Sequence, residues 1–240
     1  MGTRLAVCSI HSRSVDDELR GAIRASFLAD LPADAVAALV DGAVRVEAPA
    51  GTWVRSSPRL APTVRLVANG LLRIVRTVPD GRTITQRYMR RGEVGGIAGA
   101  FIAPNTRNTG RCDTVMRSVL YEFKNENWRL TAERDARVAV ALLAELGRIA
   151  ELSMEHMANR ALASMRQRVV GQLLDAAHYE DGLDVIAPVT QQQLADGVGS
   201  AREVVARVLH SLREEGLVAT RVGSVVLLDP ERLRSELAIS

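Results

Sequence analysis

The stretch TQQQLADGVGSAREVVARVLHSLREEGL, from Thr190 to Leu217, decides the fold of the C-terminal part of this chain. It predicts two short amphipathic helices joined by a turn at Val198-Gly199-Ser200. Thr190 is a candidate N-cap for the first helix, and Ser200 for a second helix over 201–215. An apolar stripe along the second helix is opposed by a polar face, which carries Arg202, Glu203, Arg207 and His210. This pattern is typical of a helix-turn-helix, whose second helix enters the DNA major groove.

An ordinary helical hairpin with a solvated charged face is the alternative interpretation of these two helices. The next segment favours DNA binding, because two β-rich runs flank a glycine-containing turn at Arg221-Val222-Gly223-Ser224. A β-hairpin directly after the second helix predicts a winged helix-turn-helix.

The composition is that of a globular chain without extreme charge. Of the 240 residues, 47% are hydrophobic and 25% are charged, and the formal net charge is +3. Bulk charge therefore adds little to the argument for nucleic acid. We expect no membrane span and no secretory signal. The two cysteines, Cys8 and Cys112, give no disulfide framework, so the sequence predicts a cytoplasmic protein.

In the N-terminal two thirds of the chain, the sequence pattern changes from helical to β-rich near residue 43. Helical patterning covers Val15 to Val40, and a helix-start signal stands at Leu31-Pro32-Ala33-Asp34. From Ala43 to Phe123 short β-rich runs alternate with turns, the last run being Val115 to Phe123. The turn signals are Asn69-Gly70, Pro79-Asp80-Gly81 and Gly92-Glu93-Val94-Gly95-Gly96. This spacing predicts an antiparallel barrel or sandwich.

A long helical run follows, from about Glu126 to Tyr179. Residues at alternating four- and three-residue steps form a seam suited to an identical partner helix: Leu142, Leu146, Ile149, Ser153 and His156. A second apolar face, which we expect the β-rich region to cover, holds Leu143, Ala150, Met154 and Met157. The run thus predicts a dimerisation helix, with a single long core helix as the alternative.

Several motifs carry a family resemblance. The most specific is Gly199-Ser200-Ala201-Arg202-Glu203-Val204-Val205-Ala206-Arg207. The others are Asn69-Gly70-Leu71-Leu72-Arg73, Pro79-Asp80-Gly81, Gly92-Glu93-Val94 and Gln167-Arg168-Val169-Val170. Over roughly residues 25 to 235, the chain resembles the cyclic AMP receptor protein and fumarate-nitrate regulator superfamily of bacterial transcription factors.

The resemblance implies an α+β fold, a homodimer and a sequence-specific regulator that binds double-stranded DNA and RNA polymerase. Its implied divisions are an N-terminal extension (1–24), an antiparallel β-roll sensor domain like those that bind cyclic nucleotides (25–125), a dimerisation helix (126–165) and a winged helix-turn-helix (166–240).

The resemblance also implies roles for individual residues. Arg202, Glu203 and Arg207 are the expected base readers, since arginine can donate to guanine and glutamate can accept from cytosine. The expected phosphate contacts, which position the protein without reading sequence, are Thr190, Gln191, Ser200 and Arg221.

The implied effector pocket departs from the family pattern. It consists of Gly96, Ile97, Arg107, Arg111, Cys112 and Ser153. Ile97 stands where cyclic-nucleotide binders carry a glutamate for the ribose hydroxyl, which weakens the expectation of cyclic AMP. Arg111-Cys112 or Arg107 can bind a phosphate. Cys112 beside Arg111 is a candidate redox switch, and a small buried residue is the alternative interpretation.

Two hypotheses follow for the function. The first is a homodimeric regulator of a near-palindromic site, controlled by a small molecule or a redox signal at the β-roll. The second is a DNA-binding factor without an effector, constitutive or architectural. We expect no enzyme, because no catalytic triad, metal-ligand spacing or paired carboxylates stand out. Two cysteines are also too few for a cluster with four cysteine ligands.

Overall fold

The structure is a computed structural model that describes residues 6–7, 13–54, 63–77, 83–102, 110–179 and 184–237. The chain divides into two compact units. Unit 1 comprises Met1–Arg73 and Met89–Leu152, and unit 2 comprises Ile74–Tyr88 and Ser153–Ser240. Within the described ranges, no helix is long and apolar enough to cross a membrane.

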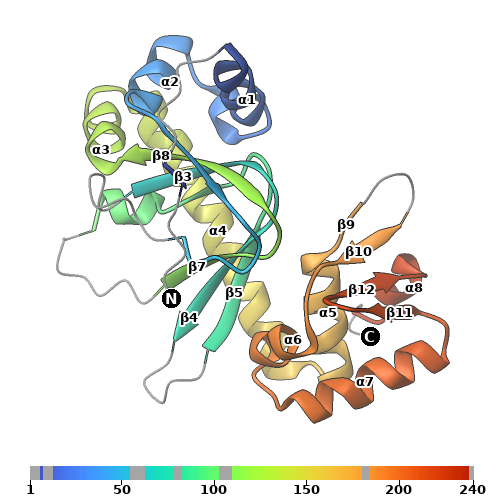
Figure 1. The fold of residues 1–240 in the computed structure, drawn as a ribbon. Helices are drawn as coiled ribbons and strands as arrows, with labels where there is room; N and C mark the ends of the chain where they lie inside the picture. The colour runs from blue at the N-terminus through green and yellow to red at the C-terminus, as the bar shows by residue number, and fades with distance from the viewer. Residues whose placement is uncertain are drawn as a thin grey trace. The chain divides into compact units, whose positions relative to one another are not determined.

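The β-rich region is antiparallel, as predicted, and its strands form two sheets (Figure 1). The first sheet has the order β1-β2-β8-β3-β6, with strands Ala6–Val7, Val44–Ala48, Ser118–Lys124, Thr63–Asn69 and Val94–Gly95. The second has the order β5-β4-β7, with strands Thr83–Met89, Leu72–Thr77 and Gly110–Thr114. The Pro79-Asp80-Gly81 signal lies outside the described residues, between β4 and β5.

The single last strand predicted from Val115 to Phe123 is wrong at its start. β7 ends at Thr114, residues 115–117 form a bend, and β8 begins at Ser118. β7 was not predicted because its sequence, GRCDT, is mostly polar. Its inward positions are satisfied internally, since the buried Thr114 hydroxyl donates to Pro49 O at 2.6 Å and accepts from Thr52 N at 2.8 Å.

Three N-terminal helical segments cover one end of these strands together with a fourth helix, α3 (Figure 1). They are α1 (Arg13–Arg24), the 3-10 helix η1 (Phe27–Asp30) and α2 (Ala33–Val40). The predicted patterning is thus interrupted at Ser26, whose hydroxyl accepts from Leu28 N at 3.2 Å and starts η1. Trp128 of α3 is fully buried and packs against Phe27 and Phe123, with ring centroids 6.4 and 6.1 Å away.

The predicted helical run from 126 to 179 consists of three helices. They are α3 (Asn125–Arg134), α4 (Ala136–Leu162) and α5 (Met165–Ala176). Asp135 is extended, and its carboxylate accepts from Arg137 N at 2.9 Å, which starts α4. Ser164 is also extended and forms a capping box with Gln167, which starts α5. Both breaks occur where a side-chain oxygen takes over a backbone N–H that a continuous helix would use.

The two apolar faces of α4 are exchanged relative to the prediction. Leu142, in the predicted seam, is 2% exposed in the core of unit 1, and Leu146 packs against the same core. His156 Nδ1 lies 3.2 Å from Gln86 O within unit 2, so this residue also faces its own chain. Leu143 is 70% exposed, on a face shared with Val140, Gly147, Ala150, Met154 and Met157. The face expected to meet the β-rich region is therefore the open one.

The C-terminal part of unit 2 is a winged helix-turn-helix, as predicted (Figure 1). Its helices are α6 (Gln191–Val198), α7 (Arg202–Glu214) and α8 (Pro230–Ser235). An antiparallel sheet of order β11-β12-β10-β9 comprises Val218–Arg221, Ser224–Leu227, Val185–Ala187 and His178–Tyr179. The wing is the β11–β12 hairpin, which turns at Gly223 with φ of 78°.

Candidate nucleic-acid interface

The first helix of the motif, α6, starts with the predicted cap. The Thr190 hydroxyl accepts from Gln193 N at 3.1 Å, and the Gln193 side chain accepts from Thr190 N at 2.8 Å. This capping box fixes the start of the helix. The remaining N–H groups of the first turn, at Gln191 and Gln192, stay available for an anion, and the helix dipole favours negative charge there.

The turn between α6 and α7 has one predicted feature and one that was not predicted. Gly199 adopts the left-handed conformation, with φ 68° and ψ 42°, which ends α6. Ser200 is not the N-cap of the second helix. Ala201 occupies that position without a side-chain cap, and α7 begins at Arg202. Ser200 instead belongs to the turn, where its backbone N–H donates to Ala195 O at 2.9 Å.

The second helix, α7, buries one side and exposes the other. Val205, Leu209 and Leu212 pack into unit 2. Arg202, Glu203 and Arg207 are exposed, at positions one, two and six of the helix. Within the part of the chain that the structure describes, none of these three forms an ion pair. The N-terminal half of α7 thus presents two guanidinium groups and one carboxylate to an external partner.

The C-terminal end of α7 is tied to α5 by Arg166. Arg166 of α5 donates to Glu215 at 2.6 Å and to Glu236 at 2.8 Å, and also contacts the Ser211 hydroxyl at 3.1 Å. The bonds to Glu236 and Glu215 raise the pKa of Arg166, and Arg166 lowers the pKa of Glu215. This arginine was not predicted from the sequence, because its partners are 49 and 70 residues away.

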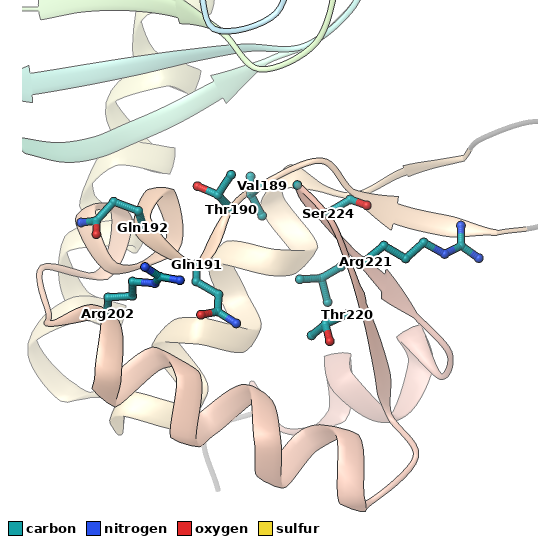
Figure 2. A pocket seen from close by; sticks show the side chains of 10 residues that line it. Val189, Thr190, Gln191, Gln192, Arg202, Thr220, Arg221 and Ser224 are labelled. Atoms are coloured by element: carbon teal, nitrogen blue, oxygen red, sulfur yellow. The ribbon is translucent and has the colours of Figure 1, made fainter.

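A concavity of about 410 Å³ lies between the start of α6, the start of α7 and the wing. Figure 2 shows Gln191 and Arg202 on the helical side of this space and Thr220 on the wing side. Gln192, Thr220 and Ser224 line it and were not predicted as site residues. Thr220 and Ser224 stand beside the predicted wing turn, and this position in the sequence could have identified them as site residues. Phosphate oxygens can accept from amide, hydroxyl and guanidinium groups of this kind.

Arg221, predicted as a phosphate contact, already has a partner. Its guanidinium donates to Asp184 at 3.2 Å, and both side chains are more than half exposed. Arg221 is one of the residues that line the concavity, and Figure 2 shows the end of its side chain pointing away from Gln191 and Arg202. Exposed pairs of this kind contribute about 0–1 kcal/mol. Asp184 would therefore compete only weakly with a DNA phosphate for the Arg221 guanidinium.

The predicted effector residues have different environments. Gly96 has φ of 87°, and a Cβ there would lie 2.5 Å from Thr63 O, so the position requires glycine. Ile97 is buried in the core of unit 1. Arg107 lies outside the described residues, and Ser153 belongs to unit 2. Ile97 is therefore a core residue, and the grouping of the predicted set into one pocket stays a prediction.

Arg111 and Cys112 lie on β7, with unequal access to solvent. Arg111 Nη2 donates to Asp113 at 2.8 Å, and its guanidinium lies over Trp53, 5.9 Å from the ring centroid. Cys112 is buried and forms no disulfide among the described residues. Asp113 was not predicted as a site residue, although an acidic residue two positions from an arginine on a strand projects to the same face. Among the described residues, no group of three or more His, Cys, Asp or Glu can hold a metal ion.

Comparison with known proteins agrees with this geometry. Residues 167–236 match the model of the Crp-like helix-turn-helix domain. The transcriptional regulator LdrP of Thermus thermophilus is 31% identical over 180 residues, covering 73% of this chain and 88% of that protein.

Solved structures give the same architecture. The c-di-GMP responsive global regulator CLP of Xanthomonas campestris is 26% identical, with a TM-score of 0.66 over 82% of this chain and 100% of that one. A transcriptional regulator of the CRP/FNR family from Eubacterium rectale has a TM-score of 0.68 at 20% identity, over 88% of this chain and 97% of that one. The second likeness concerns the fold alone.

Proposed function

This chain belongs to the CRP/FNR superfamily of transcriptional regulators, and we propose that it acts as a homodimer that reads a near-palindromic DNA site. The observation that carries the proposal is the free N-terminal half of α7. Arg202 and Arg207 can each donate to guanine O6 and N7, and Glu203 can accept from cytosine N4. The Thr190–Gln191 end of α6 and the wing residue Thr220 flank them as phosphate contacts.

The exposed face of α4 supports the dimer. Val140, Leu143, Met154 and Met157 are exposed large apolar side chains, spaced like the seam of a two-stranded coiled coil, and Gly147 and Ala150 leave room for close approach. A two-fold axis along this seam would relate two recognition helices. On DNA these would enter successive major grooves about 34 Å apart.

Within this proposal the regions have separate tasks. Residues 25–125 form the sensor domain after an N-terminal extension (1–24), residues 126–165 form the dimerisation region, and residues 166–240 read DNA. A ligand that favours one arrangement of the two reading domains would shift the population towards binding. RNA polymerase is the proposed protein partner at the promoter.

A regulator without a small-molecule effector is the second candidate, and two observations favour it over a cyclic AMP sensor. Ile97 packs in the core and cannot accept from a ribose hydroxyl. Arg111 is paired with Asp113, so the phosphate of cyclic AMP would have to compete with that carboxylate. A redox sensor at Cys112 is disfavoured because that thiol is buried. Thermal unfolding with cyclic AMP or cyclic di-GMP separates the candidates, since a ligand that binds the folded state raises its melting temperature.

The DNA test is selection of preferred duplexes from a random pool, followed by gel-shift titration of a symmetric site and of its isolated half-site. We expect the symmetric site to bind far more tightly than the half-site, because two recognition helices engage together. Equal affinity for both would contradict a dimeric reader. Failure to select any sequence would contradict sequence-specific binding.

The dimer test compares two faces of α4. Leu143→Glu and Met157→Glu each place a carboxylate on the exposed apolar face, and we expect both to give monomers in light scattering. Glu155→Lys, on an exposed position away from that face, is the matched control and should remain dimeric. A dimer that survives both carboxylate substitutions would place the interface elsewhere.

A further inference from the structure

A cluster of charged side chains lies within unit 1, beside the strand that carries Arg111. Asp113 accepts from Arg111 Nη2 at 2.8 Å and from Arg73 Nη2 at 3.4 Å. Trp53 forms an isolated bridge with Asp113 and lies under the Arg111 guanidinium. We call Arg73, Arg111 and Asp113 the Arg–Asp cluster. It places two cations around one shared carboxylate.

The cluster has a closed end and an open end. The Arg73 side chain is 8% exposed, whereas that of Arg111 is 39% exposed, and Asp113 lies between these extremes at 14%. Arg73 is therefore the covered member of the cluster, and Arg111 is the member that faces solvent. A small molecule that reaches Arg111 from solvent would meet the partly covered carboxylate next and Arg73 last.

The donors of the cluster exceed its acceptors. Arg73 Nε, Arg73 Nη1 and Arg111 Nε are buried and have no hydrogen-bond partner among the described residues. Two guanidinium groups and one carboxylate leave a net charge of +1 on these three side chains. Buried donors of native proteins are almost always paired, so an unpaired set of charged donors indicates a missing acceptor.

We propose that Arg73 and Arg111 bind a small oxyanion, a carboxylate or phosphate group, and that Asp113 is the internal counter-ion against which this ligand competes. The ligand would accept from the unpaired nitrogen atoms and neutralise the residual charge. This inference rests on the proposed sensor role of the β-roll. It adds Arg73, which neither the motif nor the family resemblance assigned to a site.

The same geometry selects a compact ligand. Asp113 lies within bonding distance of both guanidinium groups, so a second anion enters only if it is small or displaces that carboxylate. Near this strand the cyclic nucleotide pattern lacks its ribose acceptor, because Ile97 is apolar and buried. A nucleotide would therefore gain little beyond its phosphate group.

The experiment titrates the full-length protein, without DNA, with inorganic phosphate, acetate or cyclic AMP against chloride at equal ionic strength. Binding is followed by calorimetry and melting temperature. We expect a saturable response to phosphate or acetate, and the tighter of the two identifies the chemical class. Cyclic AMP binding more than tenfold tighter than inorganic phosphate would overturn the preference for a compact ligand.

Variants assign the response to the cluster. Arg73→Met keeps the apolar stem and removes the unpaired donors, and it should abolish the saturable response. Arg117→Gln, in the exposed pair with Glu47 of the same unit, is the matched control and should respond like the wild type. A response that persists in Arg73→Met, or is absent in the wild type, overturns the proposal.

Asp113→Asn tests the counter-ion and protects against a folding artefact in the first variant. It removes the competing charge while keeping the side-chain shape, so phosphate should bind at least tenfold more tightly. Unchanged or weaker binding would overturn the competitive role. Gel shifts of the same variants keep the two proposals distinguishable, because DNA binding can fail while anion binding succeeds, and the reverse.

Discussion

The arginines of the DNA-reading helix and those of the β-roll are used in opposite ways. Arg202 and Arg207 are exposed and form no ion pair within the described residues, whereas Arg65 is largely covered and donates to the buried Glu122 at 2.9 Å. A charge held by an internal partner contributes to stability, and a charge left open remains available for binding. Substitutions in the two regions should therefore affect different measurements.

The largest expected effect is on the stability of the β-roll. Glu122→Ala removes the buried carboxylate that accepts from Arg65, and the free energy of unfolding should fall by about 3–5 kcal/mol. Both tryptophans, Trp53 and Trp128, belong to unit 1, so their fluorescence in urea reports this unit. Arg117→Ala, which breaks an exposed pair, should cost no more than about 1 kcal/mol. Equal losses of stability in Glu122→Ala and Arg117→Ala would contradict the difference between covered and exposed ion pairs.

The next effect is on binding rather than folding. Arg202→Ala should weaken binding to the selected site by about 1–3 kcal/mol, roughly 5- to 150-fold, and relax the preference at one base pair. The melting temperature should hardly change, since the side chain is exposed and unpaired in the described structure. Arg213→Ala is the control on the same helix, because Arg213 contacts His210 at 2.8 Å. If specific and non-specific DNA binding fall equally, Arg202 does not read a base.

A smaller effect separates the true cap from the predicted one. Thr190→Ala removes the capping box of α6 and should lower stability by about 1 kcal/mol. Ser200→Ala should change stability by less than about 0.5 kcal/mol, because Ser200 caps no helix. Thermal unfolding followed by circular dichroism measures both. A larger loss of stability for Ser200→Ala than for Thr190→Ala would support the helix cap that the sequence predicted at Ser200.

The smallest effect depends on pH. In the folded protein the hydrogen bonds from Arg166 hold the pKa of Glu215 below its ordinary value of 4.5. The unfolded chain therefore binds the proton more readily, so this contribution to stability is complete above about pH 4.5 and is lost as pH falls through the folded pKa. Melting temperature between pH 3 and pH 6 should fall more in the wild type than in Glu215→Gln. Parallel curves would show that the pair adds nothing.

Local features of the reading module were readable from the sequence, and long-range ones were not. Thr190 and Gln193 form their box within one turn of helix, and Gly199 takes the backbone conformation that glycine favours. Arg73 and Asp113 are 40 residues apart, and no local pattern links them. The faces of α4 were exchanged because both have apolar residues at helical spacing, and periodicity does not say which face meets the sheet.

The ion pairs of Arg166 with Glu215 and Glu236 have a mechanical consequence. They fasten the beginning of α5 to the far end of α7 and to the residue that follows α8. Because of these ion pairs, a rotation of α5 about its own axis would rotate the recognition helix α7 with it. Arg166 lies two residues after Ser164, which is the break between α4 and α5. A small rotation at that joint would thus swing the tip that carries Arg202 through a larger arc.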